Sequence, residues 1–76
     1  MLHLERLDDG TQTRLLRVAA RLSQQDLASR AGIDRRRLSE HERGERPLRD
    51  AELARVHDVL ERLALTQRES FAGAVA

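Results

Sequence analysis

Residues 22–44, Leu-Ser-Gln-Gln-Asp-Leu-Ala-Ser-Arg-Ala-Gly-Ile-Asp-Arg-Arg-Arg-Leu-Ser-Glu-His-Glu-Arg-Gly, decide the fold of this chain. They predict two short helices joined by a sharp turn at Gly32, because glycine readily takes the left-handed conformation that ends a helix. The second of these helices begins with three consecutive arginines. Two short helices around a tight turn pack across each other, an arrangement that offers the second helix to the major groove of double-stranded DNA.

Capping residues set the bounds of these two helices. Ser23 precedes the first, which we predict over Gln24–Ala31, and Asp34 precedes the second, which we predict over Arg35–Glu42. Gly44 follows the second helix and favours its end there. The side chains expected to face the core are Leu27, Ala28, Ala31 and Leu38.

Apolar residues at helical spacing predict further helices on both sides of this pair. Upstream we expect a helix over Thr13–Arg21, capped by Thr11 or Thr13. Its predicted buried side chains are Leu15, Leu16, Val18, Ala19 and Leu22. Downstream we expect a long helix over Asp50–Leu63. Its predicted buried stripe consists of Leu53, Val56, Leu60 and Leu63.

The two ends of the chain carry weaker patterns. Residues 1–10 predict an arm or a short edge strand, with a turn at Asp8-Asp9-Gly10. Thr66 and Glu69 form a capping box, which predicts a fifth helix over Gln67–Val75. The prediction as a whole is an all-α, compact five-helix domain over residues 1–76, with a central helix-turn-helix.

Composition excludes several classes of protein. The 76-residue chain has no cysteine, and no apolar run approaches the roughly 20 residues of a membrane span, so we expect a cytoplasmic protein. Phe71 is the only aromatic residue, which argues against a reader of single-stranded nucleic acid, since such proteins stack bases on aromatic rings.

Charge is unevenly distributed along the chain. Residues 14–49 hold ten arginines against five carboxylates, a net +5, whereas residues 1–13 and 50–76 each sum to −2. A basic middle between acidic ends is typical of one face directed at phosphates. All fourteen basic residues are arginine, which a GC-rich genome also explains.

The stretch from Arg17 to Gly44 resembles the XRE family of helix-turn-helix proteins, the Cro and lambda-type repressor group. The motifs that carry the resemblance are Leu-Ser-Gln-Gln-Asp-Leu-Ala (22–28), Ala-Gly-Ile (31–33) and Glu-Arg-Gly (42–44). The likeness continues more loosely through Leu53, Val56 and Leu60. It therefore covers about two thirds of the chain, and it implies a lambda-repressor type of fold.

The resemblance also implies roles for individual residues. Arg35, Arg36 and Glu40 would read bases, since arginine binds guanine O6 and N7 and glutamate accepts from cytosine N4. Flanking or backbone contacts would come from Gln24, Arg37, Ser39, Arg43 and Arg46.

Some of these roles have competing interpretations. Glu40 equally fits an ion pair with Arg36 or Arg37, and Gln24 also fits an ordinary first-turn residue. The family pairs the positions of Arg17 and Glu42 as an ion pair, so we expect these two residues to be structural.

The sequence departs from the family pattern in three places. His41 stands where an apolar or aromatic residue is usual, His57 stands where alanine is common, and the loop around Pro47 is one residue longer. We expect the two histidines to form a polar spot in a small core, as structural residues. The three histidines lack metal-ligand spacing, and no catalytic motif is present, so we expect no metal site, cofactor or enzymatic activity.

These patterns predict a sequence-specific, double-stranded DNA-binding transcriptional regulator. A homodimeric repressor of phage or mobile-element type fits best, acting on an inverted-repeat operator by blocking or recruiting RNA polymerase. The alternatives are a controller protein of a restriction-modification system, and an antitoxin that binds a protein toxin. We expect the dimer contact at residues 66–76 and nearby, from Leu63, Leu65, Phe71 and Val75; the alternative is that this segment folds back onto the core.

Overall fold

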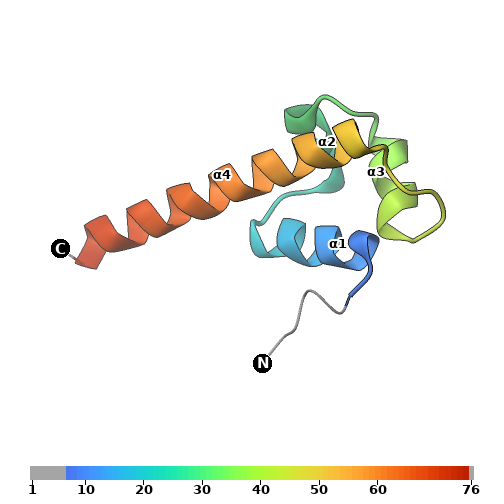
Figure 1. Ribbon diagram of the computed structural model, residues 1–76. Coiled ribbons are helices and arrows are strands. Elements are labelled where there is room, and N and C mark those ends of the chain that lie inside the picture. The colour runs from blue at the N-terminus through green and yellow to red at the C-terminus, as the bar shows by residue number, and fades with distance from the viewer. Residues whose placement is uncertain (1–6, 76) are drawn as a thin grey trace.

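The computed structural model describes residues 7–75, with side chains for residues 7–66. Within that range the chain forms four helices and no strand (Figure 1). The helices are α1 (Asp9–Ala19), α2 (Gln24–Ala31), α3 (Arg35–Glu42) and α4 (Asp50–Val75). Figure 1 shows α1, α2 and α3 gathered around the first half of α4, whose second half projects away from them.

The bounds predicted for α2 and α3 are confirmed, because local hydrogen bonds fix them. The Ser23 side chain accepts from the Asp26 amide at 3.0 Å, and the Asp34 side chain accepts from the Arg36 amide at 2.7 Å. Gly32 takes a left-handed conformation with φ 68° and closes α2. Each helix start thus satisfies an amide that has no partner inside the helix.

The start of α1 differs from the prediction of a helix over Thr13–Arg21. The cap is Asp8, whose side chain accepts from the Thr11 amide at 2.7 Å, so the expected turn at residues 8–10 is the first turn of a helix. An arm over residues 1–10 is therefore too long, and residues 1–6 lie outside the described part. The helix ends at Ala19, and Arg21 adopts a left-handed φ of 59°.

The buried face of α1 was also predicted wrongly. Gly10 and Thr13 are buried against α3, whereas the expected core residues Leu15, Leu16 and Val18 are exposed. The close contact with α3 explains the difference, because a Cβ on Gly10 would collide with the backbone carbonyl oxygen of His41. A small residue permits this approach, and hydrophobicity alone cannot show where it occurs.

The predicted fifth helix is absent as a separate element, since α4 stays helical from Asp50 to Val75. Thr66 does not cap a new helix; its hydroxyl donates to the Arg62 carbonyl at 3.0 Å within the helix. Ala64 and Leu65 are good helix formers, so nothing interrupts the chain between the two predicted segments. The alternative in which the last segment folds back is wrong, because its backbone continues along α4 (Figure 1).

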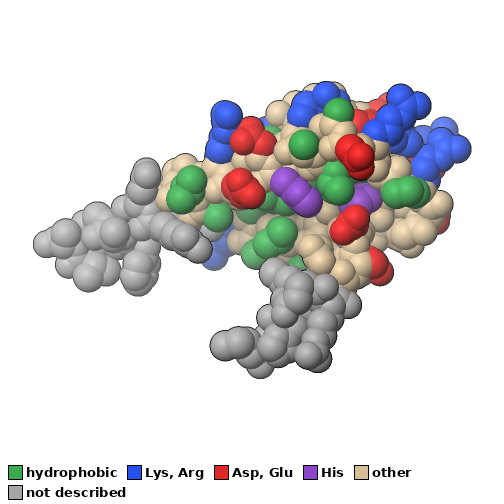
Figure 2. Space-filling view, in the orientation of Figure 1, with side chains coloured by type: hydrophobic (Ala, Val, Ile, Leu, Met, Phe, Trp, Pro, Cys, Tyr) green, Lys and Arg blue, Asp and Glu red, His purple; other side chains and the backbone are tan. Residues whose placement is uncertain are grey.

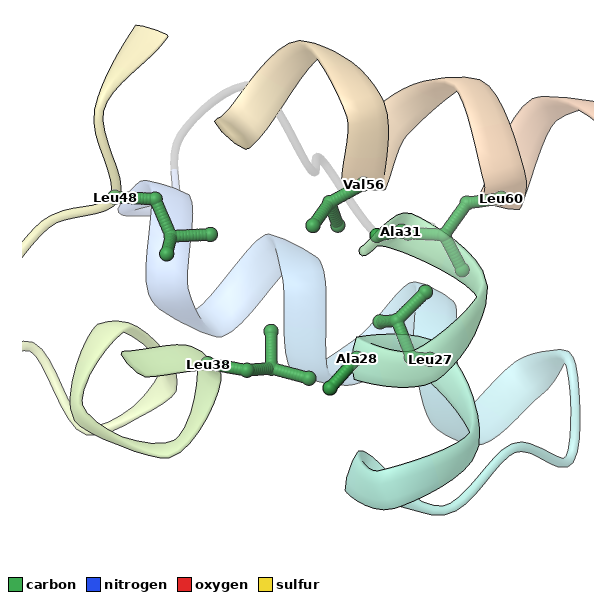
Figure 3. Close-up of a cluster of buried hydrophobic side chains, with 7 residues drawn as sticks. All are labelled: Leu27, Ala28, Ala31, Leu38, Leu48, Val56 and Leu60. Carbon is green, nitrogen blue, oxygen red and sulfur yellow. The ribbon is translucent and has the colours of Figure 1, made fainter. Parts of the chain in front are cut away.

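A small apolar core holds the four helices together. Side chains from α2, α3 and the first half of α4 converge in it, together with Leu48 from the preceding loop (Figure 3). The buried members are Leu27, Ala28, Ala31, Leu38, Leu48, Val56 and Leu60. All of those predicted for α2 and α3 are confirmed as buried, and they fix the angle at which α3 leaves the body.

Candidate nucleic-acid interface

The start of α3 presents arginines to solvent. Arg35 and Arg36 are exposed, and the side chain of Arg36 is 88% accessible. Figure 2 shows Lys and Arg side chains gathered over the part of the molecule formed by α2 and α3. An open depression lies beneath them between α2 and α3. Its lining residues are Gln25, Asp34, Arg35, Arg36, Ser39 and Arg43.

The depression brings together four of the predicted site residues and adds one that sequence reasoning missed. Gln25 lines it, whereas the predicted Gln24 does not. The Gln25 amide nitrogen donates to the Ser29 hydroxyl at 3.1 Å, which holds the side chain along the outside of α2. Both glutamines occupy the first turn of α2, so only the direction of each side chain distinguishes them.

A buried ion pair locks α1 to the end of α3, as the resemblance implied. The Arg17 guanidinium donates to both oxygens of Glu42, at 2.8 and 3.0 Å, and also to the Leu22 carbonyl at 2.8 Å. The Glu42 side chain is only 3% exposed. Gln24 joins the pair by donating to Glu42 at 3.2 Å, so its amide braces the scaffold.

Arg37 points in a different direction from its two neighbours. Its guanidinium donates to Glu52 on α4 at 2.6 Å, and Glu52 also accepts from the Arg49 amide at 3.0 Å. The hydrogen bond from Arg37, followed by that from the Arg49 backbone, lowers the pKa of Glu52 to about 2. Arg37 therefore ties α3 to the first turn of α4.

Glu40 and Arg43 form a second charged group beyond the start of α3. Glu40 lies 3.6 Å from Arg36 and 4.0 Å from Arg46, so it pairs with Arg36 and not with Arg37. Arg43 donates to Glu45 at 2.9 and 3.0 Å, and to the Ser39 hydroxyl at 3.0 Å. These contacts orient Arg36, Arg43 and Arg46 while leaving them largely exposed.

His41 sits in a chain of buried hydrogen bonds that positions the loop after α3. Its Nδ1 accepts from the Leu48 amide at 3.4 Å, which leaves Nε2 to carry the proton and donate to the Thr13 hydroxyl at 3.1 Å. That hydroxyl in turn donates to the Asp9 carbonyl at 2.8 Å. Both ring nitrogens are used, so His41 is a structural histidine as expected.

The predicted polar spot of two histidines is wrong, because His57 is exposed on α4 while His41 is 3% exposed. Helical spacing turns His57 away from the Val56 side that enters the core. Burial lowers the pKa of His41, and the charge of His57 acts in the same direction. The carboxylates of Asp8, Asp9 and Glu42 act in the opposite direction but are weaker.

We expect the protein to lose stability as pH falls below about 6.5, the ordinary pKa of histidine. The unfolded chain takes up the proton first, so the free energy of unfolding decreases by up to about 1.4 kcal/mol per pH unit for this one group. Protonated Nδ1 also cannot accept from the Leu48 amide. Urea unfolding followed by circular dichroism between pH 5 and 7 measures the slope. A His41→Gln variant should flatten it, whereas a His57→Gln variant should not; equal slopes in all three proteins would contradict this role.

Comparison with known proteins agrees with the geometry. The helix-turn-helix family model matches residues 14–67, which is more than half of the chain and includes α2, α3 and most of the other two helices. The chain belongs to the XRE-type helix-turn-helix family. Comparisons with curated proteins and with solved structures found no match.

Membership of the XRE-type family makes this a DNA-binding regulatory domain, with α2 and α3 as its helix-turn-helix. In XRE-type terms α3 is the recognition helix, which is the helix that carries the exposed arginines. Among the described residues, no helix is long and apolar enough to cross a membrane.

Proposed function

We propose that this protein is a sequence-specific transcriptional regulator that binds double-stranded DNA as a homodimer, and that it is a repressor of phage or mobile-element type. The observation that supports this most strongly is the pair of exposed arginines at the start of a helix whose far end is locked by a buried ion pair. A fixed helix presenting guanidinium groups at its N-terminus suits base recognition in the major groove.

In the proposed complex α3 enters the major groove and α2 lies across the backbone. Arg35 and Arg36 bind guanine O6 and N7, with Ser39 beside them. Glu40 orients Arg36 and accepts from cytosine N4 where that base follows. Contacts to phosphate come from Arg43 and Arg46, from Gln25, and from the N-terminus of α2 next to Gln24.

We assign Arg37 to the scaffold, because its guanidinium is held by Glu52 at 2.6 Å. This differs from the role that the resemblance implied for it. An inverted-repeat operator is expected, since a single module of this size makes few contacts and a twofold dimer doubles them. Binding there blocks or recruits RNA polymerase.

Selection on random duplex DNA should yield a half-site containing guanine opposite Arg35 or Arg36. Arg35→Ala and Arg36→Ala should each cost about 1–3 kcal/mol at one base pair and relax the preference there, because each removes a two-pronged contact. Binding is measured by fluorescence anisotropy on the selected site and on single-base variants of it. Unchanged base preference in both variants would refute the assignment.

Two matched controls separate base reading from phosphate binding. Arg46→Ala should weaken binding to all sequences alike and lower the salt slope by about one unit. Arg37→Ala should leave the base preference and the salt slope as in the parent protein. A controller protein would behave identically in this assay, whereas an antitoxin would require a toxin partner for tight binding.

A further inference from the structure

Exposed hydrophobic side chains gather on the side of the molecule formed by α1 and the second half of α4. Among the side chains that the structure describes, the large exposed ones are Leu15, Leu16 and Val18 on α1 and Leu65 on α4, with exposed fractions of 37–57%. Scattered exposed leucines are ordinary, but a group on two neighbouring elements marks an interaction surface.

An apolar groove separates these two elements. Its floor and walls come from the end of α1 and from the middle of α4, and Figure 2 shows hydrophobic side chains in the space between these helices. The groove residues are Leu16, Ala19, Ala20, Leu60 and Ala64. At its mouth the lining becomes polar, with Gln12, His57 and Glu61.

The second half of α4 extends beyond the body of the protein. Leu60 is the last residue of α4 that is buried in the described range, and residues 64–66 are exposed. From Ala64 to Val75 the helix continues for about 18 Å at 1.5 Å per residue, away from α3 (Figure 1). A helix of this length is marginal in water without tertiary contacts. In sequence, Phe71 and Val75 continue the helical spacing of Leu60 and Ala64.

Charges beside the groove are complementary between its two sides. Arg14 and Arg21 are exposed on and just after α1, whereas Asp58 and Glu61 are exposed on α4, and Glu69 follows in the projecting part of the sequence. In a twofold contact each side meets the opposite side of the partner. Basic groups beside α1 of one copy would then lie near acidic groups of the other.

We propose that a second copy of this chain occupies the α1–α4 groove. Residues 64–75 of one copy lie across Leu15, Leu16 and Val18 of the other, and the reverse contact completes the twofold dimer. This deepens the proposed function, on which it rests for the requirement of a dimer. It assigns to α1 a role at the interface and leaves α3 of each copy uncovered.

Sedimentation equilibrium in the micromolar range tests the surface. Leu16→Glu and Ala64→Glu should each weaken dimerisation about tenfold or more, because both place a charge in the centre of the contact. Ala54→Glu is the matched control, since Ala54 is also exposed on α4 but lies beside Arg30 and Arg55, outside the groove. Circular dichroism confirms folding of each variant. A monomeric parent, or dimerisation unchanged in both groove variants, would overturn the proposal.

A spin label tests the arrangement of the two copies. The chain has no cysteine, so Thr66→Cys gives a single labelling position on the exposed part of α4. Mixed with an isotopically labelled copy without the spin label, it should broaden the methyl signals of Leu15 and Val18. A label at Ser29→Cys, exposed on α2, should not. Broadening confined to α4 would overturn the α1 contact.

DNA binding distinguishes failure of this surface from failure of the proposed function. A monomeric Leu16→Glu variant that keeps the base preference of the parent on a single half-site supports both. A parent that is monomeric but sequence-specific overturns the surface and leaves DNA recognition intact. A dimeric parent without base preference, whose groove variants are monomeric, supports the surface and overturns the function.

Discussion

Replacing Glu42 with alanine should lower the free energy of unfolding by about 3–5 kcal/mol, the cost of breaking a buried ion pair from one side. The Arg17 side chain is 13% exposed, and it would lose two of its three hydrogen bonds. The Gln24 amide would lose its acceptor as well. Small domains have about 5–15 kcal/mol in total, so the variant should be largely destabilised. Urea unfolding measures the loss.

Two variants serve as controls for the Glu42 prediction. Arg62→Ala breaks the exposed pair with Asp58 and should change the free energy of unfolding by less than about 1 kcal/mol. The double variant Arg17→Met with Glu42→Leu should recover much of the loss, because an apolar pair leaves no buried charge. A loss below about 1 kcal/mol for Glu42→Ala would show that the pair does not lock α1 to α3.

Gly10→Ala should destabilise the protein by about 2–3 kcal/mol, even though alanine is the better helix former by about 1 kcal/mol. The added Cβ would collide with the carbonyl oxygen of His41, and it would lie 3.1 Å from that of Glu42. Both neighbours are backbone atoms, so α1 and α3 must move apart, and overpacking of this kind is costly. Thermal and urea unfolding report the change.

Gly44 provides the comparison for Gly10, because its φ is +74° and a Cβ there meets nothing within 4 Å. Gly44→Ala should therefore cost only the strain of a left-handed alanine, about 1–2 kcal/mol. The Gly10 variant should also shift the NMR signals of Thr13 and His41, whereas the Gly44 variant should leave Thr13 unchanged. Stabilisation by Gly10→Ala would mean that the two helices lie further apart.

The site was predictable in outline and less so in detail. The exposure of Arg35 and Arg36 follows from three arginines after a helix cap, since burying one requires a partner. The ion pair of Arg37 did not follow, because Glu52 lies fifteen residues away on another helix. Gln25 was missed because two adjacent glutamines look equivalent until the side on which α2 packs is known.

The sequence by itself determined where α2 and α3 begin and end, because Ser23, Gly32 and Asp34 act through hydrogen bonds and dihedral angles within a few residues. It also determined the buried residues of those two helices. Only the tertiary structure decided which face of α1 is buried, since the close approach of α3 places Gly10 and Thr13 inside and leaves the leucines in solvent. Such choices depend on contacts between residues far apart in the chain, which local periodicity does not record.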